Sequence, residues 1–175
     1  MPEGSATMEQ LAAATKGFMS LLARLCLAAV FVASLVGNKI PQFQQTTELM
    51  QSEGVPNPKL ALAGAIFLLA IGGVSVILGA WTRIGAFCLL VFLAAATWYF
   101  HDFWRFADPM QRQLQTIQFM KNIAIAGGLL SLLAFGGGSW SVDGWIGRKR
   151  LEVEAGGGPS AAKPRVTAKP SGQAA

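Results

Sequence analysis

A group of polar side chains at the ends of long apolar segments forms the first candidate for a binding site. Lysine, asparagine and histidine nitrogens can donate hydrogen bonds to carbonyl oxygens or to a small anion. If the segments bring these ends to one level, the group could bind a quinone headgroup or an anion. A structural role is equally open, because lysines near helix ends extend to the aqueous interface. The candidate ligand-binding residues are Asn38, Lys39, His101, Lys121 and Asn122, with Asp102 at the same level.

Three charged residues at the opposite ends of the segments indicate a structural ion pair. Charged groups at membrane depth are costly unless they are paired or reach water. We expect Asp143 to pair with Arg24 or Arg83 and so to join the first, third and fourth apolar segments. Such a pair would stabilise the assembly of the helices. The sequence does not identify catalytic residues.

The residues give little support for a redox centre held by this chain alone. Internal bis-histidine haem ligation needs two histidines, and His101 is the only one. Cys26 and Cys88 show neither a C-x-x-C motif nor metal-site spacing, so we interpret them as reduced thiols in helix packing. A catalytic dithiol is the less favoured alternative. We predict no metal site and no covalently bound cofactor.

The segments that must position these residues are long and apolar. The 175 residues are 53% hydrophobic and 13% charged, whereas soluble domains carry roughly 25% charged residues. Four continuous stretches meet or approach the roughly 20 apolar residues that a helix needs to cross a bilayer. None alternates as a membrane β-strand would. We therefore predict an all-α transmembrane four-helix bundle from residues 18–37, 60–82, 84–100 and 122–142.

The distribution of charge predicts the orientation and the boundaries. The net charge of +5 does not indicate nucleic-acid binding, because the positive residues lie at the ends of the apolar segments. Arg148, Lys149 and Arg150 follow the last segment, which predicts both termini on the cytoplasmic side. We divide the chain into a polar lead (1–16), a membrane domain (17–147) and a basic, disordered cytoplasmic tail (148–175).

Two of the segments that connect the apolar stretches allow a structural prediction. Residues 42–52 lie between Pro41 and Pro56 and predict a short amphipathic helix. Residues 80–83 leave room only for a very short turn, so the second and third membrane helices must be antiparallel neighbours.

Five groups of residues carry a family resemblance. They are Arg24 with Phe31, Gly37, Lys39 and Phe43; Gly54-Val55-Pro56; Gly72-Gly73 with Gly79 and Thr82-Arg83; Phe119 to Asn122 with Gly127-Gly128; and Gly136 with Ser141-Val142-Asp143. In this order and spacing, from about Leu21 to Trp145, the chain resembles the DoxX family of four-helix bacterial membrane proteins. Members often have a glutamate three residues before the Gly-Gly pair. Here that position is Leu69, so no role of that carboxylate carries over.

The resemblance implies a bacterial inner-membrane protein that belongs to a redox system. Relatives are subunits of a quinol oxidase or a thiosulfate:quinone oxidoreductase, or partners of thiol-handling enzymes. We therefore expect an accessory or quinone-proximal subunit, with a quinone as ligand, and with lipid and oxidoreductase subunits as partners. Whether the chain forms an oligomer, and whether it is itself an enzyme, stays open. The alternative is a non-enzymatic bundle that binds lipid or small amphiphiles, or a scaffold.

Overall fold

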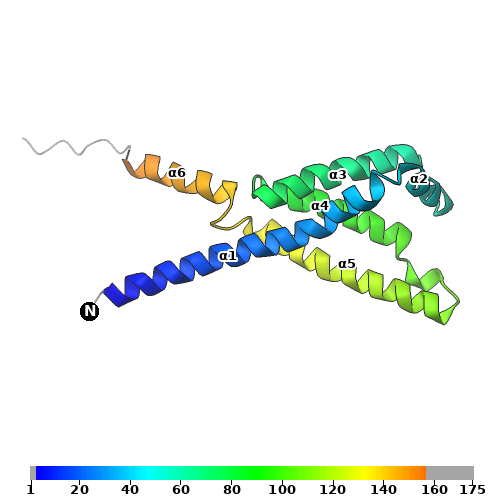
Figure 1. Ribbon diagram of the computed structural model, residues 1–175, viewed down its shortest axis with the longest axis horizontal. Helices are drawn as coiled ribbons and strands as arrows, with labels where there is room; N and C mark the ends of the chain where they lie inside the picture. Colours follow the sequence, from blue (N-terminus) through cyan, green and yellow to red (C-terminus); the bar gives the residue numbers. More distant parts are fainter. Residues whose placement is uncertain (1–2, 157–175) are drawn as a thin grey trace, which may run out of the picture.

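The computed structural model of the protein describes residues 3–156 as a succession of helices (Figure 1). No strand occurs in this part of the chain, so the all-α prediction is confirmed. The elements are α1 (Glu3–Ser34), the π-helical turn η1 (Leu35–Lys39), α2 (Phe43–Ser52), α3 (Pro58–Leu78), α4 (Thr82–Phe100), the 3-10 turn η2 (Phe103–Arg105), α5 (Pro109–Phe135) and α6 (Val142–Gly156).

Four of these helices have the length and apolar character needed to cross a membrane, as predicted. α3 and α4 lie side by side as an antiparallel hairpin, α1 packs against α3, and α5 packs against α4 (Figure 1). The short helix α2 lies at one end of the bundle, and the α3–α4 turn and α6 lie at the other (Figure 1). The candidate spans are Met8–Lys39, Pro58–Leu78, Thr82–Arg105 and Pro109–Phe135.

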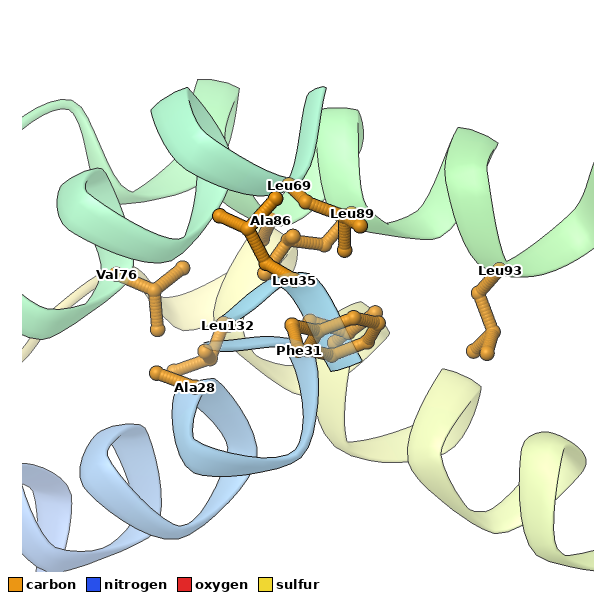
Figure 2. Packing of buried hydrophobic residues seen from close by; sticks show 10 residues of the cluster. Ala28, Phe31, Leu35, Leu69, Val76, Ala86, Leu89, Leu93 and Leu132 are labelled. Carbon is orange, nitrogen blue, oxygen red and sulfur yellow. The ribbon is translucent and has the colours of Figure 1, made fainter. Parts of the chain in front are cut away.

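The core lies where the four long helices meet. Leu69, Leu89 and Leu129 are completely buried in it, one each from α3, α4 and α5. Figure 2 shows Leu69 and Leu89 near Leu35, and Ala28 of α1 beside Leu132. The position where relatives often have a glutamate is thus filled here by an apolar core residue. The remaining buried members of the cluster are Leu35, Val76, Ala86, Leu93 and Leu132.

Glycines let the hairpin helices approach closely. A Cβ atom on Gly72 of α3 would lie 2.7 Å from the Leu89 side chain of α4. A Cβ atom on Gly85 of α4 would run into the side chain of Ser75 on α3. In lipid, where no hydrophobic force draws helices together, small residues at such crossings permit the van der Waals packing that holds them.

The opposite face of α3 carries a continuous apolar stripe. Phe67, Ile71, Val74 and Leu78 follow one another at helical spacing and are 46–63% exposed. Contiguous apolar surface of this kind is unfavourable in water and is expected where a helix faces lipid. The stripe therefore supports the membrane assignment from the structure itself.

Three boundaries differ from the sequence predictions. α1 already begins at Glu3, so the predicted polar lead 1–16 is largely helical. α5 begins at Pro109, because the Asp108 carboxylate accepts a hydrogen bond from the Gln111 amide (2.9 Å) and caps the helix. α6 extends the chain as a helix to Gly156, so the prediction of a disordered tail from residue 148 is wrong for residues 148–156.

The helical continuation has a physical reason. Arg148 and Glu152, and likewise Arg150 and Glu154, are opposite charges four residues apart, a spacing that favours helix. The remainder of the predicted tail, residues 157–175, lies outside the described residues.

Candidate functional site

A cavity of about 710 Å³ opens at the α2 end of the bundle. Its wall contains residues of α1, η1, α2, α3, α4 and α5, so it is built between the helices. All five predicted ligand-binding residues line it: Asn38, Lys39, His101, Lys121 and Asn122. We call it the α2-end cavity. The structure thus brings together side chains that are up to 84 positions apart in the sequence, from 38 to 122.

Lys39 is the half-buried cation of this cavity. Its Nζ atom donates a hydrogen bond to Ser34 Oγ at 3.0 Å and lies 5.3 Å from the centroid of the Phe92 ring. Within residues 3–156 the ammonium has no carboxylate partner, since the salt bridge found there joins Arg105 and Asp102. A cation held among apolar walls without a counter-charge favours a ligand that brings a hydrogen-bond acceptor.

The π-helical turn η1 sets the direction of Lys39. The Ile40 amide bonds to the Leu35 carbonyl (3.1 Å), five residues back instead of four. Such turns are single insertions in an α-helix and are frequent at functional sites. The Lys39 side chain consequently reaches back to Ser34 and into the cavity.

Asn122 fixes the inner wall between α4 and α5. It is 7% exposed, and its Nδ2 atom donates to Thr97 Oγ1 at 2.9 Å. The Thr97 hydroxyl in turn donates to the Leu93 carbonyl at 2.7 Å. This relay ties the two helices beside the cavity through polar groups that would otherwise be unsatisfied in a low-dielectric environment.

The remaining candidates lie at the edge of the cavity. His101 Nδ1 lies 2.9 Å from Gln115 Oε1, so the imidazole is hydrogen-bonded to a side chain of α5. Lys121 Nζ donates to Gln118 Oε1 and is exposed, as is Asn38. Asp102 is 6% exposed and bonded to Arg105 Nη1 at 2.8 Å, so its carboxylate is engaged away from the cavity.

Sequence reasoning missed the aromatic wall. Phe92, Tyr99 and Phe100 line the cavity, and none of them was among the predicted binding residues. Phe92, Ala96 and Tyr99 follow one another at steps of four and three, which places them on one face of a helix. That spacing was the available signal.

The opposite end of the bundle holds the three residues predicted to pair. Arg24 is completely buried, and its Nη1 atom donates to the carbonyls of Val76 (3.2 Å) and Ile77 (3.1 Å) at the end of α3. Its Nη2 atom donates to the Trp140 carbonyl. The guanidinium therefore satisfies carbonyls that the end of a helix leaves without partners.

Asp143 binds the start of the next helix. One carboxylate oxygen accepts from the Trp81 amide (2.8 Å), and the other accepts from the Thr82 amide (2.9 Å) and hydroxyl (2.8 Å). Among residues 3–156 Asp143 makes no direct salt bridge with Arg24 or Arg83: its carboxylate caps α4, and Arg83 donates to the Ala134 carbonyl (3.1 Å). Of the two predicted partners, Arg24 interacts with Asp143 through its charge alone. The tight turn exposes backbone groups of both helices, and the charged side chains satisfy those groups.

The bonds to Asp143 also set its protonation. Partial burial raises the pKa of its carboxyl, but the hydrogen bonds from Thr82 and Trp81, together with the positive charge of Arg24, outweigh burial. The pKa consequently lies below the ordinary value of an aspartate. Asp143 is thus charged at neutral pH, as its capping role requires.

The described residues offer few groups for a metal ion. Across residues 3–156 no three His, Cys, Asp or Glu side chains gather as a metal site would require. Cys26 and Cys88 are both free thiols, the first exposed and the second half-buried.

Two family models match the chain. The DoxX model matches residues 19–102, and the SURF4 family model matches residues 64–149. The first match runs from the second half of α1 to the end of α4 and includes most of the α2-end cavity, and the second runs from within α3 to the first half of α6. Together they span the bundle.

Two curated proteins are similar over most of their length. Inner membrane protein YqjF of Escherichia coli K12 is 32% identical over 129 residues, which cover 74% of this chain and 92% of that protein. Inner membrane protein YphA of the same strain is 29% identical over 132 residues, which cover 74% of this chain and 91% of that protein. No solved structure matches. With four apolar helices and these relatives, the chain is a multi-pass inner membrane protein and belongs to the DoxX family.

Proposed function

We propose that the protein is a quinone-proximal accessory subunit of a membrane oxidoreductase system and that the α2-end cavity holds the quinone headgroup. The observation that carries this proposal is the convergence of the polar candidates on one cavity with aromatic and aliphatic walls. Its volume lies within the range of roughly 300–1,000 Å³ that is typical of small-molecule sites.

The residues of the cavity fit a planar ring with two carbonyl oxygens. Lys39 Nζ, which has no carboxylate partner among the described residues, would donate to one carbonyl. Phe92 and Tyr99 would pack against the ring faces. A bound quinone would supply the electron-accepting chemistry, while the residues of this chain would bind and orient it and exclude water.

A neighbouring apolar groove supports the placement of an alkyl tail. The groove, about 200 Å³ in volume, lies between α4 and α5 and is lined by Trp98, Trp104 and Phe119. It shares Leu93 and Asn122 with the α2-end cavity. A ligand with its headgroup in the cavity would extend its chain along this groove towards lipid.

The proposed orientation places the α2-end cavity on the periplasmic side. Arg83, Arg148, Lys149 and Arg150 lie at the opposite end, which the positive-inside bias assigns to the cytoplasm together with both termini. Cysteine labelling with a membrane-impermeant reagent tests this in a variant whose Cys26 and Cys88 are replaced by alanine. A single cysteine introduced at Gln51 should react in intact cells, and one at Glu152 only after lysis. The reverse pattern would overturn the orientation.

The binding step can be tested on the purified protein. Equilibrium dialysis against a short-chain ubiquinone analogue should show saturable binding by the wild type and about tenfold weaker binding by Lys39→Met, which removes one charge-assisted hydrogen bond. Lys59→Met is the matched control, because Lys59 is exposed and does not line the cavity. Equal affinities in all three proteins, or no saturable binding, would contradict the proposed site.

The wider role needs a test of its own. Gentle purification from the membrane should recover an oxidoreductase partner, and the complex should show quinone-dependent activity that falls with Lys39→Met. Absence of both a redox partner and quinone dependence would contradict the accessory-subunit proposal.

The second candidate function is a non-enzymatic bundle that binds lipid or another small amphiphile. The apolar groove beside the cavity favours it as well, because an acyl chain has the same shape requirement as a quinone tail. Mass spectrometry of the purified protein distinguishes the two. A retained lipid that the ubiquinone analogue does not displace, with unchanged redox physiology after deletion, would support the second candidate.

A further inference from the structure

A second hollow, on the α6 side of the bundle, has the composition of a headgroup site. It measures about 660 Å³ and lies between the start of α4, the loop after α5 and α6. We name it the Arg83 hollow after one of its two arginines, the other being Arg148. It shares no residue with the α2-end cavity.

Both arginines are held in place by the backbone. Arg83 Nη2 donates to the Ala134 carbonyl at 3.1 Å, and Arg148 Nη1 donates to the Ser139 carbonyl at 2.8 Å. Each bond uses one of the five N–H groups of a guanidinium. The others stay available for the paired oxygen contacts through which arginine recognises phosphate.

The hollow also contains one acidic side chain. Asp143 lines it, but both of its carboxylate oxygens accept hydrogen bonds from Trp81 and Thr82. The lining therefore carries two cations against one anion whose acceptors are already used. This balance favours an anion in the hollow over a cation.

The surroundings are apolar and lie at the end of the membrane-spanning helices. Phe135 is the last residue of α5 and is 83% exposed, while Trp81 and Ile84, at the start of α4, are 77% and 60% exposed. Tryptophan at a helix end is typical of the membrane interface, where headgroups lie beside the first acyl carbons. A small soluble anion would make no contact with these apolar side chains. A phospholipid can place its phosphate on the arginines and its acyl chains against the apolar side chains.

We propose that the Arg83 hollow binds the phosphate headgroup of an anionic phospholipid, with Arg83 and Arg148 on the phosphate oxygens and the acyl chains against Trp81, Ile84 and Phe135. Basic hollows between membrane helices are a recognised form of headgroup site. This site is independent of the proposed quinone cavity, at the other end of the bundle.

The experiment measures retained lipid on the full-length protein by native mass spectrometry, after incubation with phosphatidylglycerol or phosphatidylcholine in detergent. The wild type should retain phosphatidylglycerol preferentially. The double variant Arg83→Gln, Arg148→Gln should retain about tenfold less phosphatidylglycerol than the wild type, since it lacks both phosphate-binding groups. Lys149→Gln, Arg150→Gln removes two charges from the same helix outside the hollow and should retain lipid as the wild type does.

Two further arms make the result decisive. Glycerol 3-phosphate at matched concentration should not displace the lipid, because it lacks acyl chains; displacement would show a soluble-anion site and overturn the proposal. Arg83→Lys, Arg148→Lys keeps both charges and should retain the preference in part, which covers the case that the glutamine variant does not fold. Equal retention of phosphatidylglycerol and phosphatidylcholine by the wild type, or equal loss in the Lys149 and Arg150 control, would also overturn it.

Discussion

Arg24 and Asp143 stabilise the two sides of one turn. Arg24 donates to the carbonyls of Val76 and Ile77, which end α3, and Asp143 accepts from the amides of Trp81 and Thr82, which begin α4. A cation thus lies at the negative end of one helix dipole and an anion at the positive end of the next. The two side chains come from α1 and α6, so the turn also joins both ends of the described chain to the hairpin.

Asp143→Asn should destabilise the bundle by about 1–2 kcal/mol, the usual value for a lost helix cap. The amide keeps one acceptor oxygen but cannot receive the three hydrogen bonds that the carboxylate receives. Thermal unfolding in detergent micelles measures the effect. Glu152→Gln, an exposed charge change on the same helix, is the control. If the two variants melt alike, the capping role is incorrect.

The stability of the wild type should fall in acid because of Asp143. Its pKa is lower in the folded protein than in the unfolded chain, so ionised Asp143 stabilises the fold above the unfolded-state pKa. That contribution is lost as the pH falls from the ordinary aspartate range through the folded-state pKa. Melting curves from neutral to acidic pH should show a drop in the wild type that is smaller in Asp143→Asn. Parallel curves would contradict this assignment.

Arg24→Lys should cost about 2–3 kcal/mol, because a single ammonium cannot reach carbonyls on both sides of the guanidinium and leaves buried acceptors unsatisfied. The contacts that it would lose involve Val76, Ile77 and Trp140. Arg112→Lys is the matched control, since Arg112 is exposed and donates to one carbonyl, that of Phe106. Unfolding in mixed detergent micelles compares them. Equal losses would show that burial of the three contacts does not matter.

Gly79→Ala should be more damaging than its size suggests. Gly79 has φ of 67°, a region that costs other residues about 1–2 kcal/mol, and an added Cβ would overlap the Arg24 guanidinium and Ser141. Gly64→Ala, within α3, meets open space and should be neutral or slightly stabilising. Comparing their melting temperatures tests the close approach. A neutral Gly79→Ala would mean that the turn can relax.

Much of the architecture could be predicted because it depends on segment length alone. The four apolar stretches are too long for anything but membrane helices, and the very short turn before Arg83 forces two of them to be neighbours. With that topology, Lys39 and Asn122 necessarily come to the same end of the bundle. Their placement at one end follows from connectivity, whereas the cavity between them depends on how the side chains of six elements pack.

The predicted partners of Asp143 and Arg24 differ from the observed ones, because the observed partners are backbone groups, which the residue types do not reveal. Asp143 and Arg24 carry opposite charges, so pairing them is the natural inference, yet the turn offers free amides and carbonyls that compete for both. The role of Tyr99 was missed for a related reason. An aromatic residue near a helix end suits both an interface and a cavity wall, and only the position of α2 decides between them.

The π-helical turn has a consequence for how related chains should be aligned. One extra residue between Ser34 and Ile40 advances the helical phase by about 100°. Deleting a single residue there would restore ordinary winding and swing the lysine away from Phe92 without changing any residue type. Whether a homologue keeps this cation in its cavity therefore depends on the number of residues between the positions of Ser34 and Ile40. A one-residue alignment gap there would change the direction of the lysine more than many substitutions would.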